Sequence, residues 1–398
     1  MTEKRIKIGL VGCGQIADAH LQQIRRIPWA EPVAVCDLEP LLARQAAERF
    51  DVPGQFASIE EMLEVSRPDV VHITTPVESH RPLAKLLLDA GVHVYVEKPF
   101  TVDADEARDV LDCARRNDRL LCLGHDQLFD PTWLECRERI EAGEIGDVQH
   151  VESVLGYPLH GPFGTQVIAN PDHWVRRLPG GLFQNTISHP LYRVTEFLSD
   201  DQPELQATWF SRFKQISFPT ELRAHLRGED VTGSLLFTSS TKPCHRMTRI
   251  YGTNGALEVD LNSQLIRADR VDRYPGAFAK IEAPWRRVCE SSANLAQNVR
   301  RFCKGELHYF EGMKQTFLRF YEAILEGDEG PVSYDEILRV TEIMDRIFAE
   351  CRKGDSERSE IKRRTRQTMS GTQTKKHSAD NPEGLVAELS AGNGSQTV

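Results

Sequence analysis

Six residues near the N-terminus have the composition of a turn that binds the phosphates of a dinucleotide. Residues 12–17 read Gly-Cys-Gly-Gln-Ile-Ala and lie between an apolar run at 6–11 and an amphipathic segment. The first glycine of such a turn allows a sharp bend, the second lets backbone approach a pyrophosphate, and the small last residue lets helix and strand pack closely. Free N–H groups at the helix start then favour an anion. The residues assigned to this part of the site are Gly12, Gly14, Gln15, Ile16 and Ala17.

An acidic residue stands where the ribose of a nucleotide would be bound. Asp37 follows the apolar run 33–36 and lies twenty residues after the glycine-rich turn. A carboxylate there can accept hydrogen bonds from both ribose hydroxyls, whereas it would repel a 2′-phosphate. The next residues, Leu38 and Glu39, supply no compensating cation, and Arg44 lies farther along the chain. The pattern therefore favours NAD over NADP.

A lysine follows another apolar run and could act on a reacting oxygen. Residues 97–99 read Glu-Lys-Pro directly after the run 92–96. Ligands of open parallel sheets lie at the carboxyl ends of the strands, so Lys98 could polarise a hydroxyl or a carbonyl there; a surface ion pair is the alternative. Thr-Thr-Pro at 74–76 ends a further run, and His80 follows it with either a structural or a cofactor role. The residues assigned to the cofactor site from these segments are Thr74, Thr75, Pro76, His80, Glu97 and Lys98.

The elements that must position these residues indicate a two-domain α/β protein. The 398 residues suffice for two domains, given about 100–200 residues for each. Short apolar runs alternate with amphipathic segments over residues 1–125, which predicts a parallel dinucleotide-binding sheet with helices. The runs lie at 6–11, 32–36, 70–74, 92–96 and 120–123.

The second domain is predicted over residues 126–353, with a mostly antiparallel sheet and helices. Its alternating segments lie at 205–213, 221–227, 232–237, 247–251 and 256–259, and helices are predicted at 313–326 and 334–352. Thr253-Asn254-Gly255 indicates a hairpin turn. Residues 354–398 have little apolar surface to offset the entropy of ordering, so we predict a disordered tail there.

Composition narrows the classes of partner. A formal charge of −10 argues against nucleic acid, and no apolar run is long enough for a membrane span. The nine cysteines are odd in number and contain no Cys-x-x-Cys pair, which is typical of reduced thiols in the cytoplasm. No cluster has metal-ligand spacing. We therefore expect a cytoplasmic protein that binds a small molecule without a metal.

Taken together, these motifs resemble the Gfo/Idh/MocA family of glucose–fructose oxidoreductases and inositol dehydrogenases. The resemblance implies an N-terminal Rossmann domain and a C-terminal α+β domain with a large, mostly antiparallel open sheet. It also implies NAD(P)-dependent oxidation or reduction of sugars, polyols or nucleotide sugars by homodimers or homotetramers built on that sheet. The matching pieces are residues 12–17, Asp37, 74–80, 97–99, 124–131, Gly180-Gly181 with His189, and 252–255.

The resemblance also assigns catalytic roles. The family lysine binds and activates the reacting hydroxyl, which implies that role for Lys98, and His189 corresponds to the acid/base. Asn185 stands where many members have aspartate, and we expect it to share a helix face with His189. An amide there can bind a sugar hydroxyl but cannot stabilise an imidazolium. Pro190 is expected to place His189 at a helix break.

Further residues are candidates for the substrate. Residues 170–176 contain Trp174, which could stack on a sugar or lie in the core, and Arg176, which could bind a hydroxyl or carboxylate or lie on the surface. The segment 126–131 lacks the arginine usual in the family. The substrate-binding residues are therefore predicted to be Lys98, Trp174, Arg176, Asn185 and His189.

Two other functions stay open. One is a UDP-sugar dehydrogenase, with a diphosphate held by arginines between 246 and 287. The other is a regulatory protein that binds the cofactor and has little catalytic activity, for which the replacement at Asn185 is the argument.

Overall fold

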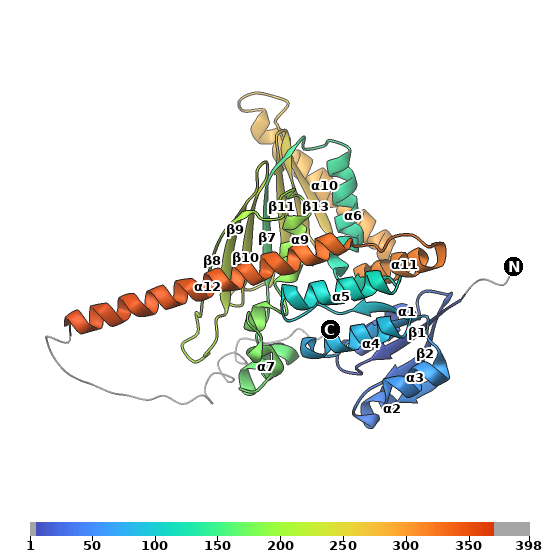
Figure 1. The fold of residues 1–398 in the computed structure, drawn as a ribbon. Coiled ribbons are helices and arrows are strands. Elements are labelled where there is room, and N and C mark those ends of the chain that lie inside the picture. Colours follow the sequence, from blue (N-terminus) through green and yellow to red (C-terminus); the bar gives the residue numbers. More distant parts are fainter. Residues whose placement is uncertain (1–4, 370–398) are drawn as a thin grey trace.

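The strands between residues 6 and 123 form a parallel sheet with helices on both faces. The computed structural model describes residues 5–369, and Figure 1 shows this sheet below a second, upright one. Its strand order is β3-β2-β1-β4-β5-β6, and every pair is parallel. This is the order of a dinucleotide-binding Rossmann fold and confirms the predicted class. The strands are β1 (Ile6–Val11), β2 (Ala30–Cys36), β3 (Gly54–Phe56), β4 (Val70–Ile73), β5 (His93–Val96) and β6 (Leu121–Leu123).

Helices from both halves of the chain cover this sheet. On one face, α1 packs beside α11, whose Phe317, Phe320 and Tyr321 lie in one apolar cluster with Ile6 and Ile8 of β1. The sequence placed α11 in the second domain, but the structure uses it to complete the first. The helices concerned are α1 (Ala17–Ile24), α2 (Pro40–Phe50), α3 (Ile59–Ser66), α4 (His80–Asp89), α5 (Ala104–Arg116) and α11 (Glu311–Glu326).

The second sheet has seven strands in the order β13-β12-β11-β7-β10-β9-β8. Only β7 and β10 are parallel; the other neighbours are antiparallel, as predicted. The predicted hairpin joins β11 to β12, with Gly252 paired to Gly255. The central strand β7 and the edge strand β13 were not predicted. The strands are β7 (Val148–Gly156), β8 (Glu204–Phe210), β9 (Glu221–Arg227), β10 (Thr232–Thr238), β11 (Arg246–Gly252), β12 (Gly255–Asp260) and β13 (Leu265–Arg270).

Shorter elements connect the two sheets, and one long helix lies along the second. Figure 1 shows α12 crossing in front of β8 and β10, and α9 lies behind it against β7 and β10. These elements are η1 (Val77–Ser79), η2 (Asp126–Phe129), α6 (Pro131–Glu141), α7 (Pro162–Ala169), α8 (Trp174–Arg177), η3 (Gly181–Phe183), α9 (Ser188–Thr195), α10 (Ala279–Cys303) and α12 (Tyr334–Met369).

The start of the predicted disordered tail is wrong, because α12 does not end at Lys353. It continues to Met369, and Asp355 accepts a hydrogen bond of 2.5 Å from Trp209 Nε1 on β8. Arg358 donates to the Trp209 carbonyl at 3.4 Å. Charged residues with high helix propensity and polar contacts to β8 replace the apolar periodicity on which the prediction relied. The remainder of the predicted tail, 370–398, lies outside the described residues.

Candidate active site

The glycine-rich turn leaves no space for a side chain at Gly12 but borders open space at Gly14. Gly12 has φ +97°, and a Cβ built there would lie 2.6 Å from Thr75 Cγ2 and 2.9 Å from Thr75 N. A Cβ at Gly14 would meet no atom within 4 Å, so this backbone borders open space. Ala17 is fully buried at the start of α1. The turn therefore fits a pyrophosphate that lies against Gly14 and the helix N-terminus.

Asp37 lies beside this turn, as the spacing predicted. Its two carboxylate oxygens accept hydrogen bonds from the N–H of Cys13 at 2.6 Å and of Glu39 at 2.8 Å. Leu38 is 93% exposed, and Arg44 pairs with Glu48 on α2. The cation that the sequence offered nearest to Asp37, Arg44, is thus engaged by another carboxylate.

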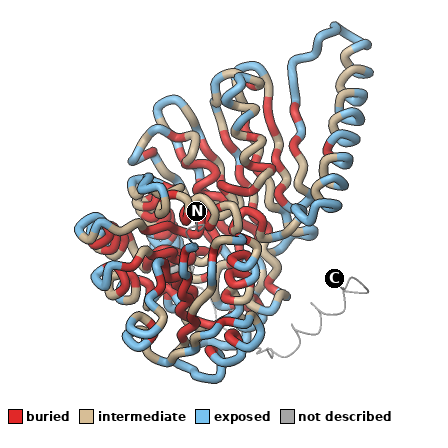
Figure 2. Tube along the Cα trace, turned by 90° about the vertical axis from the view of Figure 1, so that its right-hand side faces the viewer, coloured by how far each residue is buried: buried red, intermediate tan, exposed pale blue. Residues whose placement is uncertain are grey.

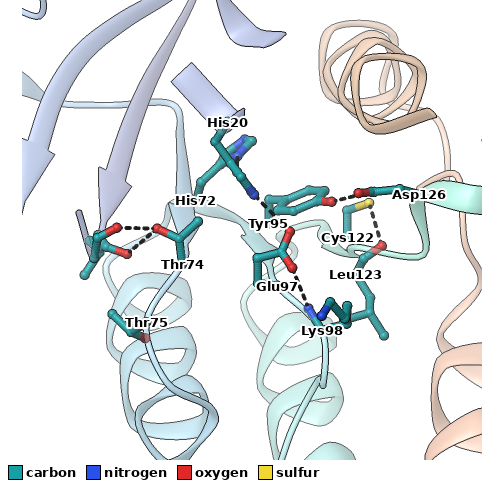
Figure 3. Close-up of polar contacts among 12 residues, drawn as sticks. His20, His72, Thr74, Thr75, Tyr95, Glu97, Lys98, Cys122, Leu123 and Asp126 are labelled. Carbon is teal, nitrogen blue, oxygen red and sulfur yellow. Dashed lines mark hydrogen bonds and ion pairs between the residues drawn. The ribbon is translucent and has the colours of Figure 1, made fainter. Parts of the chain in front are cut away.

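Two neighbouring loops are tied to the turn by buried polar contacts. Thr74 Oγ1 donates to the Gly12 carbonyl at 2.5 Å, which joins the end of β4 to the turn (Figure 3). His80 is 1% exposed, and its ring nitrogens lie 2.8 Å from the Thr75 carbonyl and 3.0 Å from that of Pro99. Burial lowers the pKa of His80. The imidazole thus connects two loops, which is the structural role that the sequence had left open beside cofactor binding.

Lys98 extends from the end of β5 to the second domain. Its Nζ donates to the backbone carbonyl of Asn185 at 3.0 Å. Burial lowers the pKa of Lys98, although Glu97 and Asp126 oppose this shift. Asn185 lies in a turn before α9 rather than on the helix, so the helical spacing from which a shared face with His189 was predicted does not apply. It contacts Lys98 through its main chain and not through its amide.

His189 lies in the first turn of α9 with its ring held by a tyrosine. Its Nδ1 is 2.9 Å from the hydroxyl of Tyr192, which also accepts a hydrogen bond from the N–H of Gln127. Burial, followed by the charges of Lys98 and Arg193, lowers the pKa of His189 well below its ordinary value. Pro190 occupies the same first turn, where its missing N–H removes no helical hydrogen bond. The break that was expected at His189 is therefore the start of α9, one residue before it. The imidazole is neutral near pH 7, as a proton acceptor must be.

A chain of buried polar groups runs from Glu97 to Tyr321 on α11 and was missed by the sequence analysis. Glu97 Oε1 is 2.9 Å from His20 Nε2, His20 Nδ1 is 2.9 Å from His72 Nδ1, and His72 Nε2 is 2.8 Å from Tyr321 OH. Figure 3 shows Glu97 between His20 and the backbone of Lys98. We call these four residues, Glu97, His20, His72 and Tyr321, the buried polar chain.

Protonation of the buried polar chain follows from its partners. Burial alone would raise the pKa of Glu97, but the hydrogen bond from His20 and neighbouring cations lower it overall. Burial lowers the pKa of His72 well below its ordinary value. The hydrogen bond between His20 Nε2 and Glu97 Oε1 thus favours the charged form of this carboxylate. The chain therefore fixes the carboxylate that directly precedes Lys98.

Asp126 is a second carboxyl group beside Lys98 that the sequence analysis did not assign to the site. It accepts a hydrogen bond of 2.8 Å from Tyr95 OH (Figure 3). Burial and the charge of Glu97 raise the pKa of Asp126 to about 7, against the effect of Lys98. Perturbed carboxyl groups of this kind are typical of functional sites. The only signal in the sequence was its place in the motif 124–131.

The arginine that segment 126–131 lacks is supplied from α9. Arg193 is fully buried and donates to Gln127 Oε1 at 2.5 Å and to Ser153 Oγ at 3.1 Å. Burial lowers the pKa of Arg193 to about 10, and its charge contributes to the lowered pKa of His189. A cation thus acts on this region from another element.

The two remaining candidates lie apart from this cluster. Trp174 packs against His173, which directly precedes it, and against Phe163 of α7. Arg176 donates to Ser217 Oγ at 2.7 Å and lies 5.4 Å from the ring centre of Phe218. Among the described residues, no hydrogen bond or ion pair joins either to Lys98 or His189, so a substrate role stays a prediction.

Within residues 5–369, no group of three or more His, Cys, Asp or Glu side chains is placed to hold a metal ion. None of the helices described there is long and apolar enough to cross a membrane.

Comparisons with known proteins identify both halves of the chain. Residues 6–125 match the family described as "Oxidoreductase family, NAD-binding Rossmann fold", and residues 133–258 match the "GFO/IDH/MocA C-terminal domain". Together these matches cover more than half of the chain.

Individual relatives are more distant. A "1-carboxy-3-chloro-3,4-dihydroxycyclo hexa-1,5-diene dehydrogenase" of Comamonas testosteroni is 31% identical over 47% of this chain and 46% of its own length. An inositol 2-dehydrogenase of Rhizobium meliloti (strain 1021) is 27% identical over 50% of this chain and 56% of its own. The chain thus spans about half the length of the curated relatives it matches.

Solved structures agree in fold over nearly the whole chain. The WlbA dehydrogenase of Bordetella pertussis, in complex with NADH and UDP-GlcNAcA, has a TM-score of 0.71 at 21% identity, covering 89% of this chain and 97% of that one. A levoglucosan dehydrogenase in complex with NADH and levoglucosan has a TM-score of 0.72 at 18% identity, covering 88% and 98%. At these identities the likeness concerns the fold.

Proposed function

Because the chain belongs to the Gfo/Idh/MocA family of NAD-binding oxidoreductases, we propose that it transfers a hydride between NAD(H) and a secondary alcohol or ketone of a sugar, polyol or sugar derivative. The nicotinamide of the bound cofactor accepts or returns the hydride. The relatives named above act on inositol, levoglucosan and a cyclohexadiene diol, according to their names, which supports a polyhydroxylated substrate.

One observation carries the proposal: Lys98, at the cofactor edge of the first sheet, contacts the second domain four residues before His189. Charge on Lys98 lowers the pKa of His189, so the two groups act on a common region. In oxidation, the ammonium of Lys98 stabilises the alkoxide that develops as the hydroxyl proton leaves. Its contact with the Asn185 carbonyl holds the side chain across the domain boundary.

His189 is suited to accept that proton. In its base form, Nδ1–H donates to the Tyr192 oxygen and leaves Nε2 free for a substrate hydroxyl. For reduction, the imidazolium returns its Nε2 proton to the product alkoxide while Nδ1–H continues to donate to the Tyr192 oxygen, which is the reverse of the oxidation step. Tyr192 can therefore serve both directions of the reaction.

NAD is the proposed cofactor in preference to NADP. The argument is the pair of short hydrogen bonds that hold the Asp37 carboxylate at the ribose position, with Arg44 engaged by Glu48. Replacing Asp37 by Ser and Leu38 by Arg should shift the ratio of kcat/KM values toward NADP. Tighter binding of NADP than of NAD by the unmodified chain would contradict the argument.

A nucleotide sugar is the second substrate candidate, because Arg246, whose charge contributes to the lowered pKa of His189, donates to Asn262 Oδ1 at 3.0 Å and forms no ion pair with a carboxylate among the described residues. Most of the other arginines considered for that role are engaged by carboxylates. The pairs are Arg249 with Asp269, Arg267 with Glu258, Arg270 with Glu144, Arg286 with Asp272 and Arg287 with Asp269.

We further propose a cytoplasmic location, from the reduced cysteines, and a homodimer or homotetramer through the open face of the seven-stranded sheet. This face carries cross-strand pairs such as Tyr251 with Glu152. The division into residues 1–125 and 126–353 is kept as a functional one, with α11 packed on the first sheet.

The proposal is tested by initial rates with NAD over inositols, aldoses and UDP-sugars, followed by two variants on the substrate found. Lys98→Ala should abolish most turnover and leave NAD affinity nearly unchanged, because the lysine acts most strongly on the alkoxide. His189→Ala should lower kcat by roughly 10²–10⁴-fold and remove the acidic limb of the pH–rate profile. That limb should lie below the ordinary histidine pKa, since burial lowers the pKa of His189.

Matched controls are Lys85→Ala, which removes a partly exposed lysine paired with Asp109, and His225→Ala on the exposed face of β9. Near-normal turnover in both site variants would show that the hydride site lies elsewhere. Tight NAD binding without turnover of any substrate would favour the regulatory alternative.

A further inference from the structure

Helix α10 packs against the rest of the chain through its polar face rather than its apolar face. It lies along β13, the edge strand of the second sheet, and contacts it through polar side chains. Asn294, its one buried residue, donates to the Ile266 carbonyl at 2.8 Å, and Glu290 accepts from the N–H of Ala268 at 3.2 Å. These contacts satisfy backbone groups that an edge strand would otherwise expose. The polar face of α10 therefore covers the sheet edge.

The apolar face of α10 is left facing away. The helix at the sheet edge is mostly pale blue and tan in Figure 2, with a single buried position. Seven large apolar side chains on or next to it are 53–72% exposed, and they follow one another at alternating intervals of three and four residues, interrupted only by Ser292. We call them the α10 stripe: Phe278, Ile281, Trp285, Val288, Leu295, Val299 and Phe302.

Alternation of three and four is the spacing of a helix that packs against another helix. The α10 stripe also reads the same in both directions about Glu290, because its intervals are symmetric around that residue. An antiparallel pairing of two such helices would place Phe278 against Phe302, Ile281 against Val299, and Trp285 against Leu295. The centre would bring Val288 against Ser292, a small residue that permits close approach. Such self-complementarity is what a twofold interface requires.

We propose that the α10 stripe binds the α10 stripe of a second copy of this chain. The two helices run antiparallel, and the twofold axis between the stripes lies at the level of Glu290 along the helix. This contact is separate from one through the open sheet face and does not depend on the proposed reaction.

The exposed area of the α10 stripe and the charges beside it support a second copy of the chain as its partner. The helix is 25 residues, or about 37 Å, long. Its aromatic residues alone expose roughly 300–500 Å², given 150–250 Å² for each aromatic side chain, which already equals the largest apolar patch of a typical monomer. A twofold axis brings the same flank of both helices together, which would place Glu282 opposite Ala296 and Cys289 opposite its own copy, so no like charges meet at these positions.

Cross-linking at a native cysteine gives a direct test on the full chain. Cys289 is exposed and lies one residue from the proposed axis, so the Cys289 thiols of two copies would be separated mainly by the distance between the helices, about 8–10 Å. A bismaleimide with a spacer of about that length should give a covalent dimer. Cys289→Ser should abolish this product. Cys303→Ser should not, because the two copies of exposed Cys303 would lie about 39 Å apart along the helices.

The mass of the assembly supplies the second measurement. Trp285→Glu combined with Leu295→Glu should halve the molar mass seen by light scattering at fixed concentration. Val65→Glu, which changes an apolar residue of α3 that is 67% exposed, should leave the mass unchanged. Far-ultraviolet circular dichroism and NAD binding would verify that the double variant is folded.

Several results would overturn the proposal. An unchanged mass for the double variant, or no cross-link through Cys289, excludes a second copy on this surface. A cross-link that forms only after residues 370–398 are removed would show that the chain's own C-terminal segment occupies the stripe. Binding to phosphatidylcholine vesicles that the double variant loses, with no change in mass, would assign the stripe to a membrane surface instead.

Discussion

Two regions of this protein reverse the usual distribution of side chains, and they do so in opposite ways. The buried polar chain puts a carboxylate and two imidazoles inside the first domain, where Glu97 is 6% exposed and both histidines are fully buried. The α10 stripe puts seven large apolar side chains at the surface of the second domain. Buried polar groups and large exposed apolar patches are the informative exceptions in protein structures.

The two regions differ in whether their side chains find contact partners within the same chain. Each member of the buried polar chain has its partner within the chain, at 2.8–2.9 Å. Its groups are therefore desolvated but hydrogen-bonded, and their energy enters the stability of the folded monomer. Within the described residues, nothing covers the α10 stripe. Its burial would instead stabilise an assembly. Substitutions in the two regions should thus separate folding from association.

The largest effect on folding is expected from His20→Phe. This change leaves the buried carboxylate of Glu97 without its imidazole partner, which typically costs about 3–5 kcal/mol of unfolding free energy. Urea unfolding at pH 7 measures it. The double variant His20→Phe with Glu97→Gln should recover part of the loss, because it removes the unpaired charge. A loss below about 1 kcal/mol for His20→Phe would show that the chain contributes little to stability.

A buried histidine without a partner provides a contrasting case. His125 packs against Tyr192 with its Nδ1 unpaired, and burial lowers its pKa to about 3. Between pH 6.5 and 3 the unfolded chain therefore binds a proton here that the folded chain does not, so stability falls as the pH falls. His125→Phe should reduce that dependence by about 1.4 kcal/mol per pH unit.

Urea unfolding at several pH values would measure the slope, with the exposed His225→Phe as the control. An unchanged slope for His125→Phe would mean that His125 titrates alike in both states.

Removing the C-terminal part of α12 should affect stability less than changes in the buried polar chain and more than changes in the α10 stripe. Its contacts with β8 are polar and partly exposed. Ending the chain after Lys353 removes the hydrogen bond between Trp209 and Asp355 and the contact of Arg358 with β8. Hydrogen bonds to charged groups contribute about 1.5–3 kcal/mol, so Tm should fall by several degrees. A chain that ends after Met369 is the control and should melt like the full chain. Equal melting of the two truncated chains would show that these contacts are dispensable.

The smallest effect on folding is expected from the α10 stripe. In the Trp285→Glu/Leu295→Glu background, where we expect no α10 contact, the further change Val299→Gln should alter the unfolding free energy by less than about 0.5 kcal/mol. The same change in the unmodified chain should weaken association. A large loss in this background would show that the stripe packs on its own chain and would remove the contrast with the buried polar chain.

The sequence predicted the parts of the fold that are encoded by neighbouring residues. Five strands of the first sheet and five of the second follow from apolar runs, and the hairpin at 253–255 follows from its turn residues. The three missed strands have weaker local signals: β3 has three residues, β7 carries polar side chains at several positions, and half of the residues of β13 are charged. The end of order near Lys353 was misplaced because α12 continues on charged residues with high helix propensity.

For the candidate site, the sequence by itself determined the glycine-rich turn, Asp37 and the lysine at the end of β5, because each is a short motif placed by the strand before it. Only the tertiary structure decided which groups meet them. Tyr321 reaches His72 across 249 positions, and Lys98 meets the carbonyl rather than the amide of Asn185. The exposure of the α10 stripe is likewise a matter of packing. Periodicity shows that a helix has an apolar face, but the direction in which that face points depends on the partners that the fold brings alongside it.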